Sequence, residues 1–514
     1  MELVMASLAR LRPDRLDALP ASVARPTYDR SALRTGIVHL GLGAFARAHL
    51  AAVNEAALRA GGEMSWGICG VSLRQADTRD ALAPQDGLYT LVLRSADPQG
   101  RPRQEAAVIG CLLESLVAPE DPQAVLARIA AEDTRIVSLT VTEKGYCHDP
   151  ASGQLNMDHP DIVHDLGQPL APRSAIGFLV RGLQQRRGAG RGPVTLMSLD
   201  NLPGNGHLLR GMVLAFARRV DPALAEWIAE ACAFPCSMVD RIVPRTTDED
   251  RREVAQALGL RDAWPVLAEP YLEWVVEDCF AAGRPDWAAG GARFVAEAAP
   301  FETLKLRMVN GAHSALAYLS MTAGWNTVDQ AVAQPVLKHY LSELMRTEIA
   351  PTLPALPGLD VAQYQQRLLR RYANPALKHQ TRQIAMDGSQ KMPQRLLDTV
   401  RARLAADQPV SCLALAVAGW LHYLRGVDQA GRRYDIQDPM AESLAVQYAL
   451  AEQAAGDAGE GPGAMLAWAA TLTGFTPVFG DLGRDPRFVL AVAQAAQTLR
   501  SLGVAGALAA LRTR

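Results

Sequence analysis

The chain has 514 residues, 49% hydrophobic and 21% charged, with a formal charge of −2 and a pI near 6.6. This length exceeds what a single hydrophobic core supports, so we expect two or three domains. The near-neutral charge provides no basic surface, which argues against nucleic acid or an anionic membrane as a partner.

The cysteines and the N-terminus indicate the compartment. Seven cysteines are present, and the nearest pair, Cys232 and Cys236, has no second pair with which to form a zinc site. Buried thiols in a reducing compartment are therefore expected. Charges recur through the first ten residues instead of a signal-peptide core, and no apolar run looks long enough to span a bilayer. We expect a soluble, cytoplasmic protein.

The first motif is a glycine turn. A strand predicted at residues 35–40 leads into Gly41-x-Gly43-x-x-Ala46 and then an alanine-rich helix. In this context Gly41 permits the tight turn, Gly43 lets the backbone approach a pyrophosphate and Ala46 allows close helix packing. Arg47 could contact a phosphate directly. The alternative is an ordinary glycine-rich turn between a strand and a helix.

An acidic residue should follow the second strand of such a fold and bind the adenosine ribose. After the strand predicted at residues 66–73, Asp77 is the candidate and Asp80 the reserve, while Arg74 leaves NADP open. The predicted cofactor contacts are Ile37, Gly41, Gly43, Ala44, Phe45, Ala46, Arg47 and Asp77.

Two further strands end in polar residues. The strand at residues 135–142 is followed by Glu143, Lys144 and Tyr146, and the strand at residues 194–199 by a loop over 200–207. Ligands of doubly wound sheets bind outside the carboxyl ends of the strands, so these residues should lie at the site. Asp240 and Arg241 belong either to this site or to a structural ion pair.

The strands and helices alternate up to a glycine-rich cluster at residues 283–291, beyond which the sequence is almost entirely helical. We predict an α/β fold, with a doubly wound Rossmann-type domain at residues 1–294 and an α-helical substrate domain at 295–514. Within the helical part, residues 374–395 carry several cations and amides. They could bind an anionic or polyhydroxylated molecule, or form a solvated helix face.

The segment 301–319 predicts a helix that is apolar nearly all round, and therefore buried. At about 100° per residue, four polar side chains fall within an arc of roughly 140°. They are Glu302, Lys305, Asn310 and His313. Such a set could transfer a proton at an alcohol or carbonyl without a metal. The alternative is a structural helix whose lysine reaches water.

These segments together resemble the long-chain polyol dehydrogenases, the mannitol dehydrogenase family. The most specific match is Lys305-x4-Asn310-x2-His313, and residues 198–201 and 238–242 match further shared segments. The resemblance covers nearly the whole chain.

Within the family, the chain looks closest to the D-mannonate oxidoreductases, also called fructuronate reductases. Residues 142–147 and 383–395 support this, because mannitol-specific members usually have glycine in place of Lys144 and arginine in place of Gln383. Residues 73–77 and 85–89 look more like the mannitol enzymes. Ala46 also departs from the family pattern, in which most members have histidine.

The resemblance implies NAD-dependent hydride transfer to or from a secondary alcohol carbon, with no metal. Lys305 would be the general acid–base, and burial would lower its pKa toward the working pH. Asn201 and Asn310 would donate hydrogen bonds to the developing alkoxide. His313 would orient the substrate oxygen.

The remaining implied roles concern proton release and substrate binding. Glu302 would relay the proton outward, and Asp240 would bind substrate hydroxyls. The substrate carboxylate would be bound by Lys144, Lys378 or Lys391, with Lys391 favoured, and Gln383 belongs to the same substrate segment.

Two alternatives remain. One is mannitol or another polyol or aldonate as substrate, and the other is an inactive nucleotide-binding regulator. The expected partner is a small sugar acid or polyol, with no nucleic acid and no membrane. The sequence is compatible with a monomer.

Overall fold

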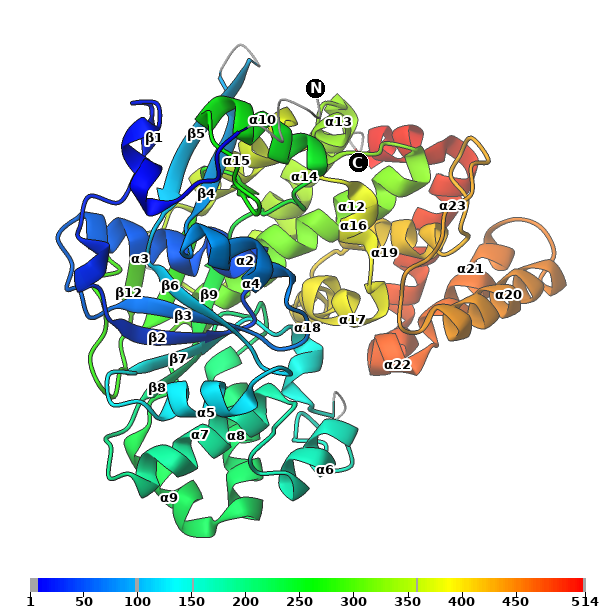
Figure 1. Ribbon diagram of the computed structural model, residues 1–514. Coiled ribbons are helices and arrows are strands. Elements are labelled where there is room, and N and C mark those ends of the chain that lie inside the picture. Colours follow the sequence, from blue (N-terminus) through cyan, green and yellow to red (C-terminus); the bar gives the residue numbers. More distant parts are fainter. Residues whose placement is uncertain (1–7, 98–100, 150–151, 357–358, 512–514) are drawn as a thin grey trace. The chain divides into compact units, whose positions relative to one another are not determined.

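The computed structural model describes residues 8–97, 101–149, 152–356 and 359–511 (Figure 1). The chain divides into two compact units, Met1–Glu302 and Thr303–Arg514. The division falls a short way beyond the boundary predicted at residue 294. The units are described one at a time below.

The first unit is built on a parallel five-stranded sheet in the order β6-β3-β2-β7-β8. All six residues of the central strand β2 are buried, as expected for a parallel strand covered on both faces. The strands are β2 (Thr35–Leu40), β3 (Gly67–Ser72), β6 (Leu112–Val117), β7 (Ile136–Leu139) and β8 (Thr195–Ser198).

Helices cover both faces of this sheet, with α2 and α3 on one side and α5, α7 and α8 on the other (Figure 1). The alternation along β2 shows the same division, because Ile37 packs in one hydrophobic cluster and Val38 in another. The predicted doubly wound Rossmann-type fold is confirmed. The helices of this unit are α2 (Ala44–Ala48), α3 (Leu50–Arg59), α4 (Asp77–Leu82), α5 (Pro122–Ala130), α6 (Pro160–Gly167), α7 (Ala175–Gly188), α8 (Asn205–Val220), α9 (Pro222–Ala231) and α10 (Asp248–Leu258).

Two smaller sheets complete the unit. One has the order β1-β5-β4-β10 and the other β12-β11-β9. Their strands are β1 (Val23–Ala24), β4 (Tyr89–Ala96), β5 (Pro102–Ile109), β10 (Val266–Ala268), β9 (Ser237–Asp240), β11 (Glu273–Glu277) and β12 (Ala292–Val295).

A buried histidine on β2 makes the stability of this unit depend on pH. His39 is 1% exposed, and its ring nitrogens lie 2.9 Å from the Ser138 hydroxyl and 3.0 Å from the Thr140 hydroxyl. Burial lowers the pKa of His39 to about 4, so the folded protein holds it neutral. The unfolded chain takes up the proton below its ordinary pKa of about 6.5, so stability is lost as the pH falls from there toward 4.

We therefore expect His39 to account for a loss of about 2 kcal/mol in unfolding free energy between pH 7 and pH 5. Urea unfolding at both pH values, with wild type and His39→Asn, measures this contribution. The variant should depend less on pH by that amount, and an unchanged dependence would contradict the assignment.

The second unit is helical and has one large hydrophobic core, which includes residues of α12, α19, α21 and α23. The prediction of a mostly α-helical C-terminal domain is confirmed. Its α-helices after α11 (Ala299–Leu304) are α12 (Ala312–Ala323), α13 (Val328–Val332), α14 (Pro335–Glu343), α15 (Val361–Tyr372), α16 (Thr381–Ala385), α17 (Gly388–Met392), α18 (Asp398–Ala405), α19 (Ser411–Tyr423), α20 (Ala441–Asp457), α21 (Pro462–Thr473), α22 (Thr476–Phe479) and α23 (Pro486–Ala510). Three π-helical segments interrupt them, η5 (Lys305–Gly311), η6 (Leu344–Ile349) and η9 (Pro393–Leu397).

One helix contradicts the expectation that no apolar segment reaches bilayer length. Among the described residues, α23 is long and apolar enough to cross a membrane by length and composition. Helices from protein cores pass the same test. Here the backbone leaves the helical conformation at Gly503, and Phe488 and Val492 of α23 are part of the hydrophobic core.

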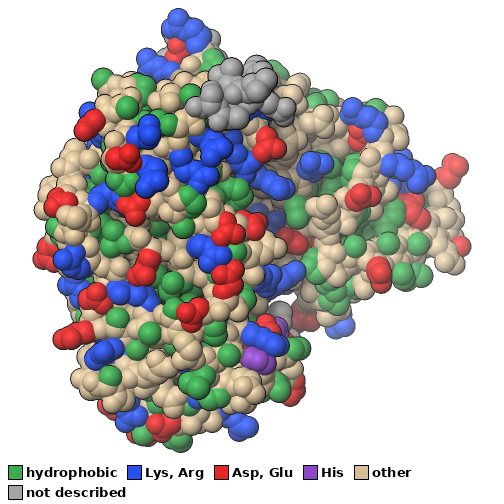
Figure 2. Space-filling model, viewed as in Figure 1, with side chains coloured by type: hydrophobic (Ala, Val, Ile, Leu, Met, Phe, Trp, Pro, Cys, Tyr) green, Lys and Arg blue, Asp and Glu red, His purple; other side chains and the backbone are tan. Residues whose placement is uncertain are grey.

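The surface carries both signs of charge. Figure 2 shows Lys and Arg side chains interspersed with Asp and Glu over the visible face. This mixture accords with the formal charge of −2.

Candidate functional site

The glycine turn follows β2 directly, as predicted. Gly41 has φ of +93°, and a Cβ atom there would lie 2.1 Å from the Thr140 carbonyl oxygen, so only glycine fits. Gly43 is exposed, and its Cβ would meet only one atom, 3.9 Å away. The backbone at Gly43 is therefore open to a ligand. Ala46 is buried, and the exposed Asp77 begins α4 just beyond the end of β3.

The side chain of Arg47 is directed into the protein. It is 3% exposed, and its Nη1 donates a hydrogen bond to the Trp264 carbonyl 2.5 Å away. The guanidinium also lies 5.2 Å from the centre of the Tyr89 ring. The phosphate contact predicted for Arg47 would require the guanidinium to leave these partners.

An aspartate holds together the ends of β7 and β8. Asp200 accepts hydrogen bonds from the backbone N–H groups of Val141 and Thr142, 3.0 and 2.9 Å away, and from the Tyr146 hydroxyl at 2.8 Å. These bonds fix Thr142, whose φ is +62°. Asn201, the next residue, is exposed. The predicted loop residue therefore follows a segment that is fixed by hydrogen bonds.

The other side of this loop is anchored by an asparagine and a glutamate. The Asn205 amide donates to the backbone oxygens of Ser198, Asp200 and Ser237 and accepts from the Ser237 N–H. The Glu302 carboxylate accepts a hydrogen bond from the Gly204 N–H at 2.9 Å.

Glu302 retains a free oxygen. Its Oε1 is buried and has no hydrogen-bond partner among the described residues. Burial raises the pKa of Glu302. A carboxylate with a raised pKa and an unused oxygen is suited to accept a proton.

Asp240 ends β9 and is 7% exposed. The neighbouring Arg241 donates to the backbone carbonyls of Ala48 and Glu269. Arg241 is thus held by backbone oxygens and fixes the end of this strand.

The predicted helix at 301–319 is interrupted. Residues Lys305–Gly311 form a π-helix, so the expectation of one continuous α-helix is wrong there. In an α-helix, Lys305 and Asn310 would point about 140° apart. A π-helix closes hydrogen bonds between residues five apart, which brings 305 and 310 one turn apart on the same side. Such segments are rare and concentrate at functional sites.

The polar residues of this segment are buried. Lys305, Asn310 and His313 are 7%, 6% and 9% exposed. Among the described residues, Asn310 Nδ2 and His313 Nε2 have no hydrogen-bond partner. Each such group costs free energy in the folded protein. Two of them on adjacent turns leave two nitrogens that a molecule bound there could use as hydrogen-bond partners.

His313 lies in a cationic environment. Its ring stacks on Tyr372 at 4.2 Å between centres, and His379 lies edge-on at 5.9 Å. Burial lowers the pKa of His313 well below its ordinary value, and Arg371, Arg395 and Lys305 lower it further. The imidazole is therefore neutral at physiological pH.

One lysine of the predicted substrate segment, residues 374–395, already makes hydrogen bonds within the protein. The Lys391 ammonium donates to the carbonyls of Ile384 and Met386, at 3.3 and 2.5 Å, and burial lowers its pKa to about 8. Lys378 and Gln383 are exposed in this unit, and Lys144 is exposed in the first.

Three potential metal ligands meet in the first unit. Donor atoms of Cys147, His159 and Asp161 lie within 4.8 Å of one another. However, His159 Nδ1 accepts the Asp161 N–H at 3.2 Å, which places the ring proton on Nε2. The imidazole then has no lone pair for a metal, and the group serves to cap α6.

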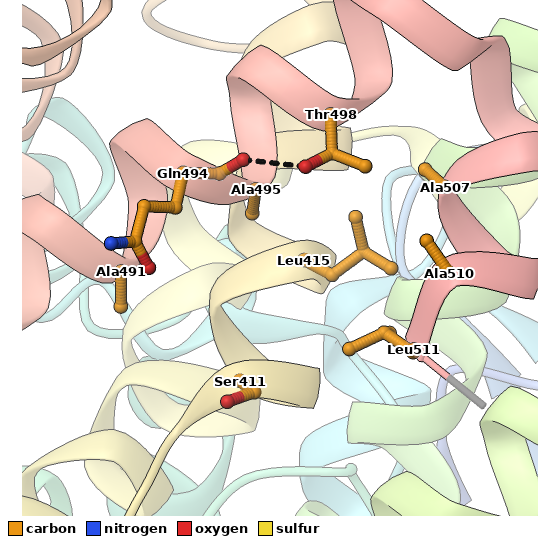
Figure 3. Close-up of a pocket in the computed structure, with 9 residues that line it drawn as sticks. All are labelled: Ser411, Leu415, Ala491, Gln494, Ala495, Thr498, Ala507, Ala510 and Leu511. Atoms are coloured by element: carbon orange, nitrogen blue, oxygen red, sulfur yellow. Dashed lines mark hydrogen bonds between the residues drawn. The ribbon is translucent and has the colours of Figure 1, made fainter. Parts of the chain in front are cut away.

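A pocket in the helical unit is lined by none of the predicted site residues. Figure 3 shows it between α19 and α23, where the Thr498 hydroxyl donates to the Gln494 carbonyl at 2.8 Å. It is lined by Ser411, Leu415, Ala491, Gln494, Ala495, Thr498, Ala507, Ala510 and Leu511. No charged side chain lines it, so it offers no proton-transfer chemistry.

Comparison with known proteins connects these features. A family model described as the mannitol dehydrogenase Rossmann domain matches residues 35–289, and one for the mannitol dehydrogenase C-terminal domain matches residues 297–500. The D-mannonate oxidoreductase of Escherichia coli is 44% identical over 95% of this chain and 98% of its own. A mannitol 2-dehydrogenase of Phaeosphaeria nodorum is 40% identical over 95% of this chain and 83% of its own.

A solved structure is also similar over its whole length. The mannitol 2-dehydrogenase of Pseudomonas fluorescens, in a ternary complex with NAD and D-mannitol, superposes with a TM-score of 0.87. It is 36% identical and covers 98% of this chain and 100% of its own. Both units are matched by family models, and relatives span nearly the full sequence. The chain therefore belongs to the mannitol dehydrogenase family of oxidoreductases.

Proposed function

We propose that this protein is an NAD-dependent secondary-alcohol dehydrogenase that interconverts D-mannonate and D-fructuronate. The observation that carries the enzymatic part is the π-helical segment with buried Lys305, Asn310 and His313, two of which have a nitrogen without a partner. A nucleotide-binding regulator has no need of these costly groups.

The first unit suits NAD. Gly41 makes the tight turn, Gly43 leaves an open backbone for the pyrophosphate, and Asp77 follows β3 where a ribose hydroxyl would be bound. NAD, when bound, supplies the nicotinamide ring that exchanges a hydride with the substrate carbon.

The residues of the chain would manage the proton and the developing charge. Lys305 would remove the hydroxyl proton during oxidation and return it during reduction. Asn310 and Asn201 would donate hydrogen bonds to the substrate oxygen as its negative charge grows. Neutral His313 would orient that oxygen through Nε2.

Two carboxylates complete the proposed site. Glu302 would accept the released proton on its free oxygen, consistent with the raised pKa of this group. Asp240 would bind a substrate hydroxyl.

The choice of a sugar acid is supported by residues 142–147 and 383–395, which resemble the mannonate enzymes, and by the 44% identical relative. Initial rates with D-mannonate, D-altronate and D-mannitol, followed by NADH absorbance with NAD or NADP, test it. We expect the highest kcat/KM with mannonate and NAD. Preference for uncharged mannitol would refute the sugar-acid assignment.

Mannitol oxidation is the second candidate. It is favoured by the mannitol-type residues at 73–77 and 85–89 and by the similar structure in complex with D-mannitol. The same panel of substrates decides between the two.

The two glycines give a matched test of cofactor binding. Gly43→Ala is expected to weaken NADH binding at least about tenfold with little loss of stability, because the new methyl group faces open space beside the backbone. Gly41→Ala should instead unfold more readily, since its Cβ would collide with the Thr140 carbonyl. Fluorescence titration with NADH and thermal melting measure both effects. Unchanged NADH affinity in Gly43→Ala would contradict the cofactor assignment.

We also propose that the protein works in the cytoplasm. All seven cysteines are free, as expected in a reducing compartment.

A further inference from the structure

One cation of the helical unit has no direct ion-pair partner among the described residues, and the opposite charge that acts on it is that of Asp387. Arg395 lies in the π-helix η9, and its Nη1 donates a hydrogen bond to the Ser314 hydroxyl 3.3 Å away, the one side-chain hydrogen bond of its guanidinium among the described residues. Among the described residues, no carboxylate lies within 4.0 Å of it. Four of the five N–H donors of a guanidinium are thus left for another partner.

The position of Arg395 is fixed relative to the proton-transfer segment. A Cβ atom on Gly311 would lie 2.7 Å from the Arg395 carbonyl oxygen, so the glycine allows η9 to pack closely on η5. Ser314, which accepts the hydrogen bond, directly follows His313. The positive charge of Arg395 lowers the pKa values of both His313 and Lys391. The hydrogen bond to Ser314, the residue after His313, places the guanidinium beside the proton-transfer segment.

The environment of the guanidinium favours an anion. The residue keeps part of its accessible surface, yet burial lowers the pKa of Arg395. A charge that is reachable but poorly hydrated gains most from an anionic partner. A guanidinium presents a planar fork that binds a carboxylate through two parallel hydrogen bonds.

Lys391, the neighbouring cation, is less suited to this role. Its ammonium already donates to two backbone carbonyls and lies 4.0 Å from the Asp387 carboxylate. Its positive charge is thus partly satisfied within the protein.

Resting on the proposed function, we infer that Arg395 is the specificity-determining residue that binds the carboxylate of a sugar-acid substrate. Lys391 would then add a second positive charge beside the bound carboxylate. The enzyme would distinguish an aldonate from a polyol mainly through the Arg395 guanidinium.

The test compares a charged and an uncharged substrate. Arg395→Gln should lower kcat/KM for D-mannonate about 100-fold or more and that for D-mannitol less than about fivefold. Arg395→Lys keeps the charge but loses the fork, so its loss on mannonate should be smaller, about tenfold. Arg370→Gln removes an exposed arginine of α15 and is the matched control. NADH affinity and thermal melting establish that each variant is folded.

The outcomes separate this inference from the proposed function. If the wild type uses mannonate and Arg395→Gln retains its kcat/KM, only the role of Arg395 is refuted. Equal losses on both substrates would assign Arg395 a general structural or electrostatic role and would also refute the inference. If the wild type uses mannitol and neither binds nor turns over mannonate in calorimetry and rate assays, the sugar-acid function fails and this inference fails with it.

Discussion

Replacing Lys305 by alanine is expected to lower kcat by about 100- to 10,000-fold, the range typical of a lost general acid–base. Lys305 begins the π-helix and is 7% exposed, and its positive charge lowers the pKa of His313. It is therefore a buried amine beside the imidazole and amide proposed to contact the substrate oxygen. NADH affinity should remain nearly unchanged, since the glycine turn that would bind the cofactor is unaltered.

The control and the rescue make this prediction specific. Lys338→Ala removes an exposed lysine from α14 and should leave kcat unchanged. Small primary amines added to Lys305→Ala should restore part of the activity, because they can occupy the vacated space and accept the proton. A variant that keeps kcat within about fivefold of wild type across the pH range would remove Lys305 from its role.

Local conformational requirements made part of the site predictable. At Gly41 a positive φ and a nearby carbonyl admit only glycine, so strand, glycines and helix form a recognisable pattern. The apolar strand at 35–40 was similarly clear, because a parallel strand buried on both faces needs a continuous apolar sequence. These features depend on residues that are close in the chain.

The π-helix was not predictable in this way. The sequence of residues 305–311 favours an α-helix as strongly as the sequences on either side of it do. The π-helical segment ends at Gly311, which packs against the backbone of Arg395, more than eighty residues later in the chain. The Asp200 clamp on Val141 and Thr142 also joins distant segments. That Arg395 has no direct ion-pair partner among the described residues likewise cannot be read from the sequence, because it depends on which carboxylates the fold brings within 4.0 Å.

The second prediction concerns Asn310, whose amide we propose is kept for activity at a cost in stability. Asn310→Ala is expected to lower kcat about 100- to 1,000-fold, as for loss of one donor to a developing oxyanion, with a smaller change in KM. Stability should stay equal or rise, because Asn310 Nδ2 is buried without a partner in the described part of the chain and its removal relieves that cost. Steady-state kinetics and thermal melting of the same variant measure both effects.

Asn205 provides the opposite case in the same chain. Its buried amide makes four hydrogen bonds, so Asn205→Ala should destabilise the first unit by about 3 kcal/mol or more. Comparing the two variants therefore distinguishes an amide that stabilises the fold from one that serves catalysis. If Asn310→Ala melted as early as Asn205→Ala, the Asn310 amide would be an ordinary structural group, and its unpaired nitrogen would carry no functional meaning. A stable but slow Asn310→Ala enzyme is the combination expected of an amide that contacts the substrate.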